Sequence, residues 1–394
     1  MSARVFRNAN DIVYGRGALE HLKTINARRA LVLTGQSAME KSGVLASAVS
    51  CLEETGAQVE VIKGTKPEPP IEDVEAQLET TLALQPDLIV ALGGGSVIDT
   101  AKALWVFYEH PELDPHELFK THVSRPYPLP KLGDRARLVA IPSTSGTGSE
   151  TSGVSILVEA ETRIKRVLLS AELVPNVAIV DPEVALPMPS RLTAHTGMDA
   201  LTHALESVVS PWATDFSEPL ALRSLQLIFA NLRAACNDDD REARERIHYA
   251  ATLAGMAINN SITGLAHGMD KIGLQFDLPH GLTCALLLPY TMQFSAAEAS
   301  AGYARIAISI GLQGEDEDAL TLALINVLLK LEKDIGIPQS FQELGIEKSK
   351  FTDRVGLVSE NALQAGPTVF SPRVPSQEEL EQLYLQAYRG DLLN

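Results

Sequence analysis

The sequence predicts two fold classes in one chain, an α/β part with a mostly parallel sheet over residues 1–185 and an all-α part over residues 186–394. In the first part, short apolar runs alternate with helical segments, as parallel strands and crossover helices do. In the second part, Ala and Leu recur at helical spacing and no comparable strand is visible. A chain of 394 residues is also longer than one hydrophobic core usually supports.

Three strand-to-helix units are readable in the first part. ALVLTG (30–35) leads into a helical segment, DLIVALGGGS (87–96) leads into VIDTAKALWVFYEH, and RLVAIPSTSGTGSE (137–150) follows a proline-rich loop. Each apolar run has the length of a buried strand. Small and polar residues follow these strands, at the edge of a parallel sheet where ligands bind.

The second part reads as consecutive helices from about residue 190, with segments such as EPLALRSLQLIFANLRAA and ALTLALINVLLKLEKDIG. The acidic runs NDDD (237–240) and GEDED (314–318) precede helical segments, where negative charge interacts favourably with the helix dipole. The spacing of an EF-hand is absent, so we interpret these runs as helix caps and solvated surface rather than as calcium sites.

Charge and composition restrict the partners of the chain. A formal net charge of −17 disfavours nucleic acid and anionic membrane surfaces, which leaves small molecules as the expected partners. No apolar run approaches the roughly 18 residues of a membrane helix, and the N-terminus lacks the apolar core of a signal peptide. The three cysteines, Cys51, Cys236 and Cys284, are too widely spaced for a CxxC site, and their odd number does not suggest a disulfide framework. We therefore expect a cytoplasmic protein.

Two loops of the first part have the composition of a phosphate- or ribose-binding crevice. In LGGGSVIDTAK, three glycines between a strand and a helix allow backbone N–H groups to converge on an anion. Gly93 and Gly95 match the usual dinucleotide fingerprint, whereas Ile98 stands at the position of its third glycine. The second loop, PSTSGTGSETS (142–152), combines glycines and hydroxyl residues after another strand. A tight turn and a flexible Ser/Gly loop are the competing interpretations.

The helical part contains candidate metal ligands. Asp199 and His203 are four residues apart in a predicted helix, so both side chains project from one face. His267 and His280 add two imidazoles. One carboxylate and three imidazoles suit Fe²⁺ or Zn²⁺ rather than Mg²⁺ or Ca²⁺. Spacing alone is equally compatible with ordinary polar residues on helices.

Four motifs that occur in order, GGGSVIDTAK, PSTSGTGSETS, TGMDALTHALE and DLPHGLTCALLLP, together resemble the iron-containing (group III) alcohol dehydrogenase family of the dehydroquinate synthase-like superfamily. The resemblance covers almost the whole chain. It implies a Rossmann-like dinucleotide-binding domain over residues 1–185 and a helical metal-binding and substrate domain over residues 186–394. It also implies a small alcohol or aldehyde as substrate, NAD or NADP, Fe²⁺ or Zn²⁺, and a homo-oligomer, dimer or larger.

The same resemblance implies roles for individual residues. The implied metal ligands are Asp199, His203, His267 and His280. The implied cofactor contacts are Gly35, Gly94, Gly95, Ser96, Asp99, Thr144, Thr147 and Lys165. The expected lining of the catalytic pocket includes Asp270, Lys271 and Phe276, and a lysine there would suit a substrate that carries a negative group.

The segment HGMDK departs from the family pattern, in which a second histidine often follows the third ligand by four residues. Counting forward from His267 places Lys271 at that position, and counting back from His280 places Asp270 there. The proton-relay histidine is missing on either count, and His195 is the candidate replacement. The interval from His267 to His280 is one residue shorter than in the family, which would rotate one ligand by about 100° along a continuous helix.

Cofactor choice is the second departure. NAD-preferring members of the family commonly have an Asp at the end of the strand that corresponds to ALVLTG (30–35). This chain has Gly35 and Gln36 there, so NADP becomes admissible. Glu68 stands where Asn is frequent, and Glu206 lacks a matching ligand role and is expected to be structural.

Two other functions compete with a metal-dependent alcohol dehydrogenase. One is a metal-independent enzyme resembling maleylacetate reductase, which the retained Asp and His set disfavours. The other is a non-catalytic binding protein. It is disfavoured because the phosphate loop and all four candidate metal ligands are present in the same chain.

Overall fold

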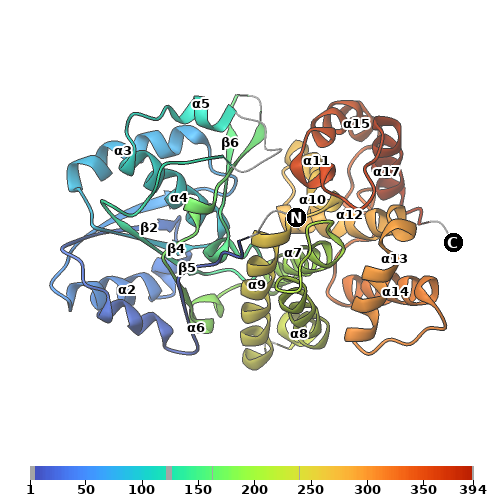
Figure 1. Ribbon diagram of the computed structural model, residues 1–394, viewed down its shortest axis with the longest axis horizontal. Coiled ribbons are helices and arrows are strands. Elements are labelled where there is room, and N and C mark those ends of the chain that lie inside the picture. The colour runs from blue at the N-terminus through green and yellow to red at the C-terminus, as the bar shows by residue number, and fades with distance from the viewer. Residues whose placement is uncertain (1–4, 121–126, 162, 239, 393–394) are drawn as a thin grey trace. The chain divides into compact units, whose positions relative to one another are not determined.

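The computed structural model describes residues 5–120, 127–161, 163–238 and 240–392, and the chain divides into two compact units, Met1–Met188 and Pro189–Asn394. The first unit combines strands and helices, and the described residues of the second form helices without strands (Figure 1). The predicted combination of an α/β part and an all-α part is therefore confirmed. None of the described helices is long and apolar enough to cross a membrane.

A six-stranded, entirely parallel sheet forms the centre of the first unit, in the order β1-β8-β5-β4-β2-β3. Its strands are β1 (Asp11–Tyr14), β2 (Arg29–Gly35), β3 (Gln58–Thr65), β4 (Leu88–Gly93), β5 (Arg137–Pro142) and β8 (Val177–Val180). The three predicted strands are β2, β4 and β5, which lie side by side. A separate antiparallel pair, β6 (Val154–Glu159) and β7 (Ile164–Leu169), was not predicted.

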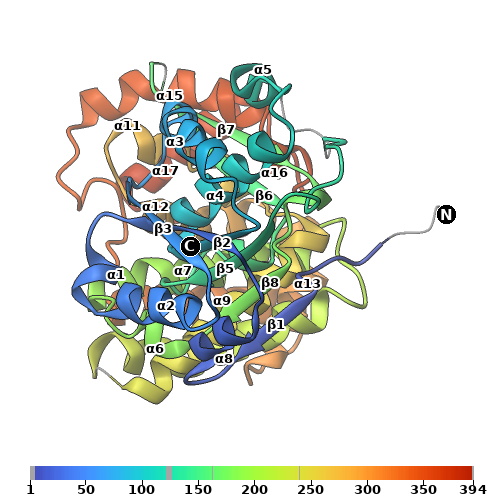
Figure 2. The same cartoon turned by 90° about the vertical axis from the view of Figure 1, so that its left-hand side faces the viewer.

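Helices cover both faces of this sheet. They are α1 (Ala38–Lys41), α2 (Val44–Glu53), α3 (Ile71–Leu84), α4 (Gly95–Glu109), α5 (Pro115–Lys120) and α6 (Pro182–Ala185), with short 3₁₀ turns η1 (Ala18–Thr24), η2 (Ser149–Thr151) and η3 (Ala171–Leu173). Successive residues of β2 point to opposite faces: Leu31 belongs to the core that contains Trp105 of α4, and Val32 belongs to the core that contains Leu52 of α2. Figures 1 and 2 show α3 and α4 on one face and α2 on the other.

The described residues of the second unit form helices, of which α7 contacts α8, α9, α12 and α13. They are α7 (Ser190–Val209), α8 (Glu218–Asn237), α9 (Arg241–Ser261), α10 (Leu265–Met269), α11 (Lys271–Gln275), α12 (His280–Phe294), α13 (Ala296–Ser309), α14 (Glu317–Asp334), α15 (Lys348–Leu363), α16 (Gly366–Val369) and α17 (Gln377–Arg389). α12 approaches α7 so closely that a Cβ on Gly281 would lie 2.2 Å from the carbonyl oxygen of His195. Only glycine fits there without moving one of the two helices.

The acidic runs cap helices, as predicted. Asp240 accepts hydrogen bonds from the backbone N–H groups of Glu242 and Ala243 at the start of α9. Asp316 accepts one from Ala319 at the start of α14. Both satisfy donors that a helix N-terminus leaves unpaired.

Glu332, on α14, is a buried carboxyl that makes stability depend on pH. Its side chain is 1% exposed, and burial raises its pKa well above the ordinary value of 4.5, although Gln339 opposes the shift. The folded state therefore keeps a proton that the unfolded chain loses, so stability falls as the pH rises above 4.5.

Glu332→Gln should therefore stabilise the protein more at pH 8 than at pH 5. Each kcal/mol would raise the Tm by about 2–4 °C in a unit of this size. Thermal unfolding followed by circular dichroism at both pH values measures this, with the exposed Glu315→Gln as control. An equal Tm change at both pH values would show that Glu332 is ionised in the folded state.

Candidate metal centre and cofactor loops

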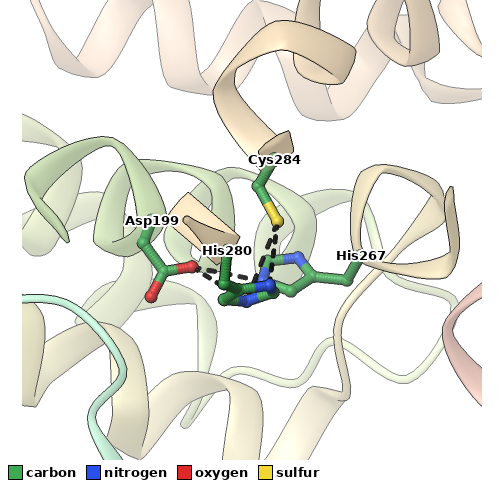
Figure 3. A group of neighbouring side chains, drawn as sticks. All are labelled: Asp199, His267, His280 and Cys284. Carbon is green, nitrogen blue, oxygen red and sulfur yellow. Dashed lines mark hydrogen bonds and ion pairs between the residues drawn. The ribbon is translucent and has the colours of Figure 1, made fainter. Parts of the chain in front are cut away.

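Asp199 lies at the centre of a cluster of polar side chains in the second unit. Asp199 and His203 lie one turn apart on α7, while His267 belongs to α10 and His280 begins α12. The Nε2 atoms of His280, His267 and His203 lie 3.4, 3.5 and 3.9 Å from Asp199 Oδ1. The structure thus brings together the four residues that were predicted as metal ligands, and Figure 3 shows three of them.

Several polar atoms of this cluster lack a hydrogen-bond partner. Among the described residues, Asp199 Oδ1, His267 Nε2 and His203 Nδ1 are buried without one. Burying such an atom unsatisfied costs about 1–3 kcal/mol, more for a charged group. Two ligands about 2.0–2.2 Å from a tetrahedral ion lie roughly 3.3–3.6 Å apart, which agrees with the two shorter separations from Asp199. The cluster therefore fits a divalent cation.

Carboxylates orient two of the three histidines. Glu206 Oε2 lies 2.6 Å from Nδ1 of His267, and Asp270 Oδ2 lies 2.9 Å from Nδ1 of His280. Each contact leaves the Nε2 atom of its ring directed towards Asp199. Carboxylate–histidine pairs of this kind fix the tautomer and orientation of metal-binding imidazoles.

Glu206 is held in place by the backbone before His267. Its Oε2 and Oε1 atoms accept hydrogen bonds from the N–H groups of Gly264 and Ala266, both at 2.7 Å. Sequence reasoning expected only a structural role for this residue and missed its contact with His267. A signal was present, because Asp199, His203 and Glu206 follow the i, i+4, i+7 spacing of one helical face.

The electrostatics of the cluster suit cation binding. Burial alone would raise the pKa of Asp199, but the neighbouring His203 and His280 lower it well below its usual range, so the carboxylate is charged. Burial lowers the pKa of His203 to about 4, so its imidazole is neutral at neutral pH. A carboxylate and a neutral imidazole are the protonation states that bind metals. At His267, burial lowers the pKa, but Cys284 and Glu206 together raise it well above its ordinary value, so a metal ion would have to displace a proton there.

The short interval between His267 and His280 does not rotate the ligands away from each other. α10 ends at Met269, α11 occupies Lys271–Gln275, and a loop precedes α12. The two histidines therefore lie on separate helices, and the rotation of about 100° expected for a continuous helix does not arise. Within this loop, Asp277 has a φ of 53°, an unusual conformation for a residue other than glycine.

Asp270 and Lys271 contact each other beside the cluster. Lys271 Nζ lies 2.6 Å from Asp270 Oδ1, and Asp270 is 4% exposed. The other carboxylate oxygen of Asp270, Oδ2, contacts Nδ1 of His280, so Asp270 is placed to orient the ring of His280.

Cys284 also belongs to the cluster, although the sequence analysis did not assign it there. Its Sγ atom lies 3.8 Å from both ring nitrogens of His280. The donor atoms of Asp199, His267, His280 and Cys284 all lie within 4.8 Å of one another (Figure 3). The available signal was its spacing, since Cys284 follows His280 by one helical turn.

The two predicted cofactor loops of the first unit meet at the carboxyl ends of β4 and β5. A Cβ on Gly94 would lie 3.1 Å from Thr144 Cγ2, and one on Gly95 would lie 2.7 Å from Thr147 Cγ2. The two threonines therefore require glycines opposite them. Gly94 caps α4, whose first residues, Gly95 and Ser96, place their N–H groups at the start of the helix.

A buried polar network fixes the second loop to α4. Asp99 accepts hydrogen bonds from Ser149 Oγ at 2.6 Å and from the N–H of Ile156 at 3.1 Å. Lys102 Nζ donates to Ser149 Oγ at 2.9 Å and to the carbonyl of Ser152 at 2.7 Å. Asp99 was predicted as a cofactor contact, and both of its oxygens bond within the chain.

Two further predicted positions in the first unit have defined surroundings. Lys165 Nζ lies 3.4 Å from Glu68 Oε1, which gives a partner to the glutamate that replaces the family's frequent Asn. Gly35 ends β2, and a Cβ there would lie 3.8 Å from Val97 Cγ2 and 3.9 Å from the carbonyl of Thr65. A Cβ at Gly35 therefore meets only ordinary van der Waals contacts.

Known proteins resemble the chain over its whole length. Residues 9–182 match the family model described as iron-containing alcohol dehydrogenase, and residues 193–388 match that of the C-terminal part of the same family. The NADPH-dependent butanol dehydrogenase of Clostridium saccharobutylicum is 39% identical over 98% of both chains. An alcohol dehydrogenase of Thermococcus barophilus is 38% identical over 96% of this chain and 97% of its own. The structure of an iron-containing alcohol dehydrogenase from Thermococcus thioreducens has a TM-score of 0.91 and 38% identity, covering 98% of this chain and 100% of that one.

Glu206→Ala should weaken metal binding by about 10- to 100-fold, the range for loss of a carboxylate behind a ligand histidine. The substitution removes the acceptor for His267 Nδ1 and leaves the ring free to turn. Competition against a chromophoric chelator measures the affinity. Glu218→Ala, which removes an ion pair with Arg305 elsewhere in this unit, is the matched control. Equal metal affinities in the two variants would show that Glu206 does not orient His267 for metal binding.

Proposed function

The chain belongs to the iron-containing alcohol dehydrogenase family, and from this premise we propose that it interconverts a small primary alcohol and its aldehyde at the Asp199 cluster. The observation that carries the proposal is that three buried atoms of this cluster have no hydrogen-bond partner among the described residues. These atoms are Asp199 Oδ1, His267 Nε2 and His203 Nδ1. The similarity to named alcohol dehydrogenases over nearly the full chain supports the reaction class.

The proposed metal ligands are Asp199, His203, His267 and His280. Asp199 contributes negative charge to a buried site, and the neutral imidazole of His203 binds without a competing proton. When bound, Fe²⁺ or Zn²⁺ supplies Lewis acidity at the substrate oxygen, and a bound nicotinamide accepts or returns hydride. The protein's own contribution is orientation, through Glu206 behind His267 and Asp270 behind His280.

The proposed cofactor site is the pair of loops after β4 and β5. We assign the pyrophosphate to the N–H groups of Gly94, Gly95 and Ser96 at the start of α4. Thr144 and Thr147 lie against these glycines and are assigned to the nucleotide as well. Asp99 would act indirectly, by holding the second loop through Ser149.

Proton transfer does not use a histidine in the HGMDK segment. Asp270 contacts both His280 and Lys271, so we assign it a positioning role, and we assign Lys271 an electrostatic one. Burial and, secondarily, Arg191 lower the pKa of His195 to about 4. His195 is therefore neutral at neutral pH, and we assign it no role as a charged proton donor.

Two further parts of the proposal have other grounds. A homo-oligomer, dimer or larger, rests on the resemblance alone, and a cytoplasmic location rests on the cysteine content of the sequence. Light scattering of the purified protein tests the first.

Metal content and turnover should fall together in His267→Ala, because the variant loses a ligand. We expect metal affinity to drop by more than about 100-fold, beyond the effect of losing an outer carboxylate. Elemental analysis of protein purified without chelator, with oxidation of NADH and NADPH assayed on short aldehydes such as butanal, measures both. His195→Ala should keep its metal.

Three outcomes of this experiment separate the competing functions. Turnover that survives complete metal removal would favour an enzyme that resembles maleylacetate reductase. Absence of turnover with any metal or cofactor would favour a binding protein. Equal metal content in the wild type and in His267→Ala would show that the ligand assignment is wrong.

Gly35→Asp should impair the use of NADPH. The NADPH dependence of the butanol dehydrogenase relative supports NADPH here, and a carboxylate at the end of β2 would repel a 2′-phosphate. Repulsion of about 1.4 kcal/mol corresponds to a tenfold rise in the KM for NADPH. Gly35→Asn, of equal size and without charge, is the control. If both variants raise this KM equally, side-chain size rather than charge is responsible.

A further inference from the structure

A cleft of about 340 Å³ lies at the end of the parallel sheet where its strands begin. Its lining includes Arg29 at the start of β2, Asp87 just before β4 and Arg135 shortly before β5. The proposed cofactor loops follow the carboxyl ends of β4 and β5, and the six residues of β4 span roughly 20 Å. The cleft is therefore separate from the proposed cofactor site, and it belongs entirely to the first unit.

Positive charge is concentrated in this cleft, although the chain as a whole has a net charge of −17. Arg28, Arg29 and Arg135 line it together with one carboxylate, Asp87. Asp87 forms an ion pair with Arg28, whose Nε lies 3.2 Å from Oδ2. Glu109, outside this lining, accepts hydrogen bonds from the backbone N–H groups of Arg135 and of the next residue. Neither Arg29 nor Arg135 has an ion-pair partner among the described residues.

The side chains of Arg29 and Arg135 are each anchored at one nitrogen. Arg29 Nε donates to the carbonyl of Gln85 at 2.7 Å, and Arg135 Nη1 donates to the carbonyl of Tyr108 at 2.8 Å. These carbonyls lie at the C-terminal ends of α3 and α4, where positive charge is favourable. A guanidinium carries five N–H donors, so contact with a helix end orients each group and leaves most of its donors for a ligand.

Tyr108 shows that the two guanidinium groups lie near each other. The guanidinium carbon of Arg135 lies 5.7 Å from the centre of the Tyr108 ring. Burial raises the pKa of the Tyr108 hydroxyl, and the charges of Arg135 and Arg29 both oppose this rise. Both positive charges therefore act on the same hydroxyl, which is itself fixed by a 2.9 Å hydrogen bond to the carbonyl of Pro86.

We propose that this cleft binds the phosphate group of a small molecule between the guanidinium groups of Arg29 and Arg135. Arginine binds phosphate oxygens through paired N–H donors. A phosphate monoester carries about 1.5–2 negative charges at neutral pH, which matches two guanidinium groups without ion-pair partners. Leu82, which is 39% exposed and also lines the cleft, offers a contact for an apolar part of the ligand. The inference is independent of the proposed function, because it uses none of the residues assigned to the metal or the cofactor.

Isothermal titration calorimetry of the full chain with phenyl phosphate at low ionic strength tests the site. Arg135→Gln should bind phenyl phosphate about 10-fold more weakly than the wild type, the effect of losing one hydrogen bond to a charged group. Arg137→Gln should bind it as the wild type does. Arg137 is the matched control because it lies two residues further on, its replacement removes the same charge, and its side chain bonds to the carbonyl of Asn26.

Two results of this titration would overturn the proposal. An equal loss of affinity in Arg135→Gln and Arg137→Gln would show that net charge rather than the cleft is responsible. An unchanged affinity in Arg135→Gln would place the phosphate elsewhere, for example at the cofactor loops, neither of which contains an arginine. Arg29→Gln is the second variant, with the same expected loss, and thermal unfolding by circular dichroism checks that each variant is folded.

Three probes identify the chemistry that the cleft recognises. Tighter binding of phenyl phosphate than of inorganic phosphate, with the difference lost in Leu82→Ala, would support an organic phosphate ester as the ligand. Equal binding of the two would support free phosphate. Benzoate has the same ring and a single negative charge, so it should bind more weakly than phenyl phosphate. Benzoate that binds as tightly as phenyl phosphate, or a wild type that binds none of the three, would overturn the phosphate site.

Discussion

The buried charge of Asp199 is the constraint on which the second unit depends. An isolated carboxylate inside a helical core is unfavourable by several kcal/mol unless positive charge or donors compensate for it. Here the histidines converge on one oxygen from three helices, α7, α10 and α12. The close packing of α12 on α7 at Gly281 is what brings His280 within reach. The packing of α12 on α7 and the charge of Asp199 therefore both favour the same arrangement of the histidines.

A buried charge organises the first unit as well. Lys102 is 0% exposed, and its ammonium group bonds to the hydroxyl of Ser149 and to backbone carbonyls of the second cofactor loop. Asp99 bonds the same hydroxyl from one helical turn earlier. Both side chains therefore hold the loop that the glycines at the start of α4 face. The motif GGGSVIDTAK thus contains both the backbone of an anion site and the side chains that fix its neighbour.

The sequence allowed us to predict those elements and residues that can be recognised from a short stretch of chain. β2, β4 and β5 are buried on both faces, so they read as continuous apolar runs, whereas the edge strand β3 and the β6–β7 pair carry charged or exposed residues and escaped notice. The four Asp and His residues were visible by type. Cys284 was not, because a lone cysteine in an apolar helix resembles a core residue. Glu206 was undervalued because its partner, His267, lies 61 positions away in the chain.

The segment between Gly264 and Asp270 explains how the centre is built without the family's second histidine. Its backbone N–H groups fix Glu206, its His267 is oriented by that same Glu206, and its last residue orients His280. A carboxylate at position 270 cannot replace an imidazole as a relay while it holds both His280 and Lys271. It can, however, fix the ring of His280 through Nδ1, which leaves Nε2 of that ring towards Asp199. The chain has thus exchanged a group suited to proton transfer for one suited to ligand orientation, and the break between α10 and α11 allows one short segment to serve both histidines.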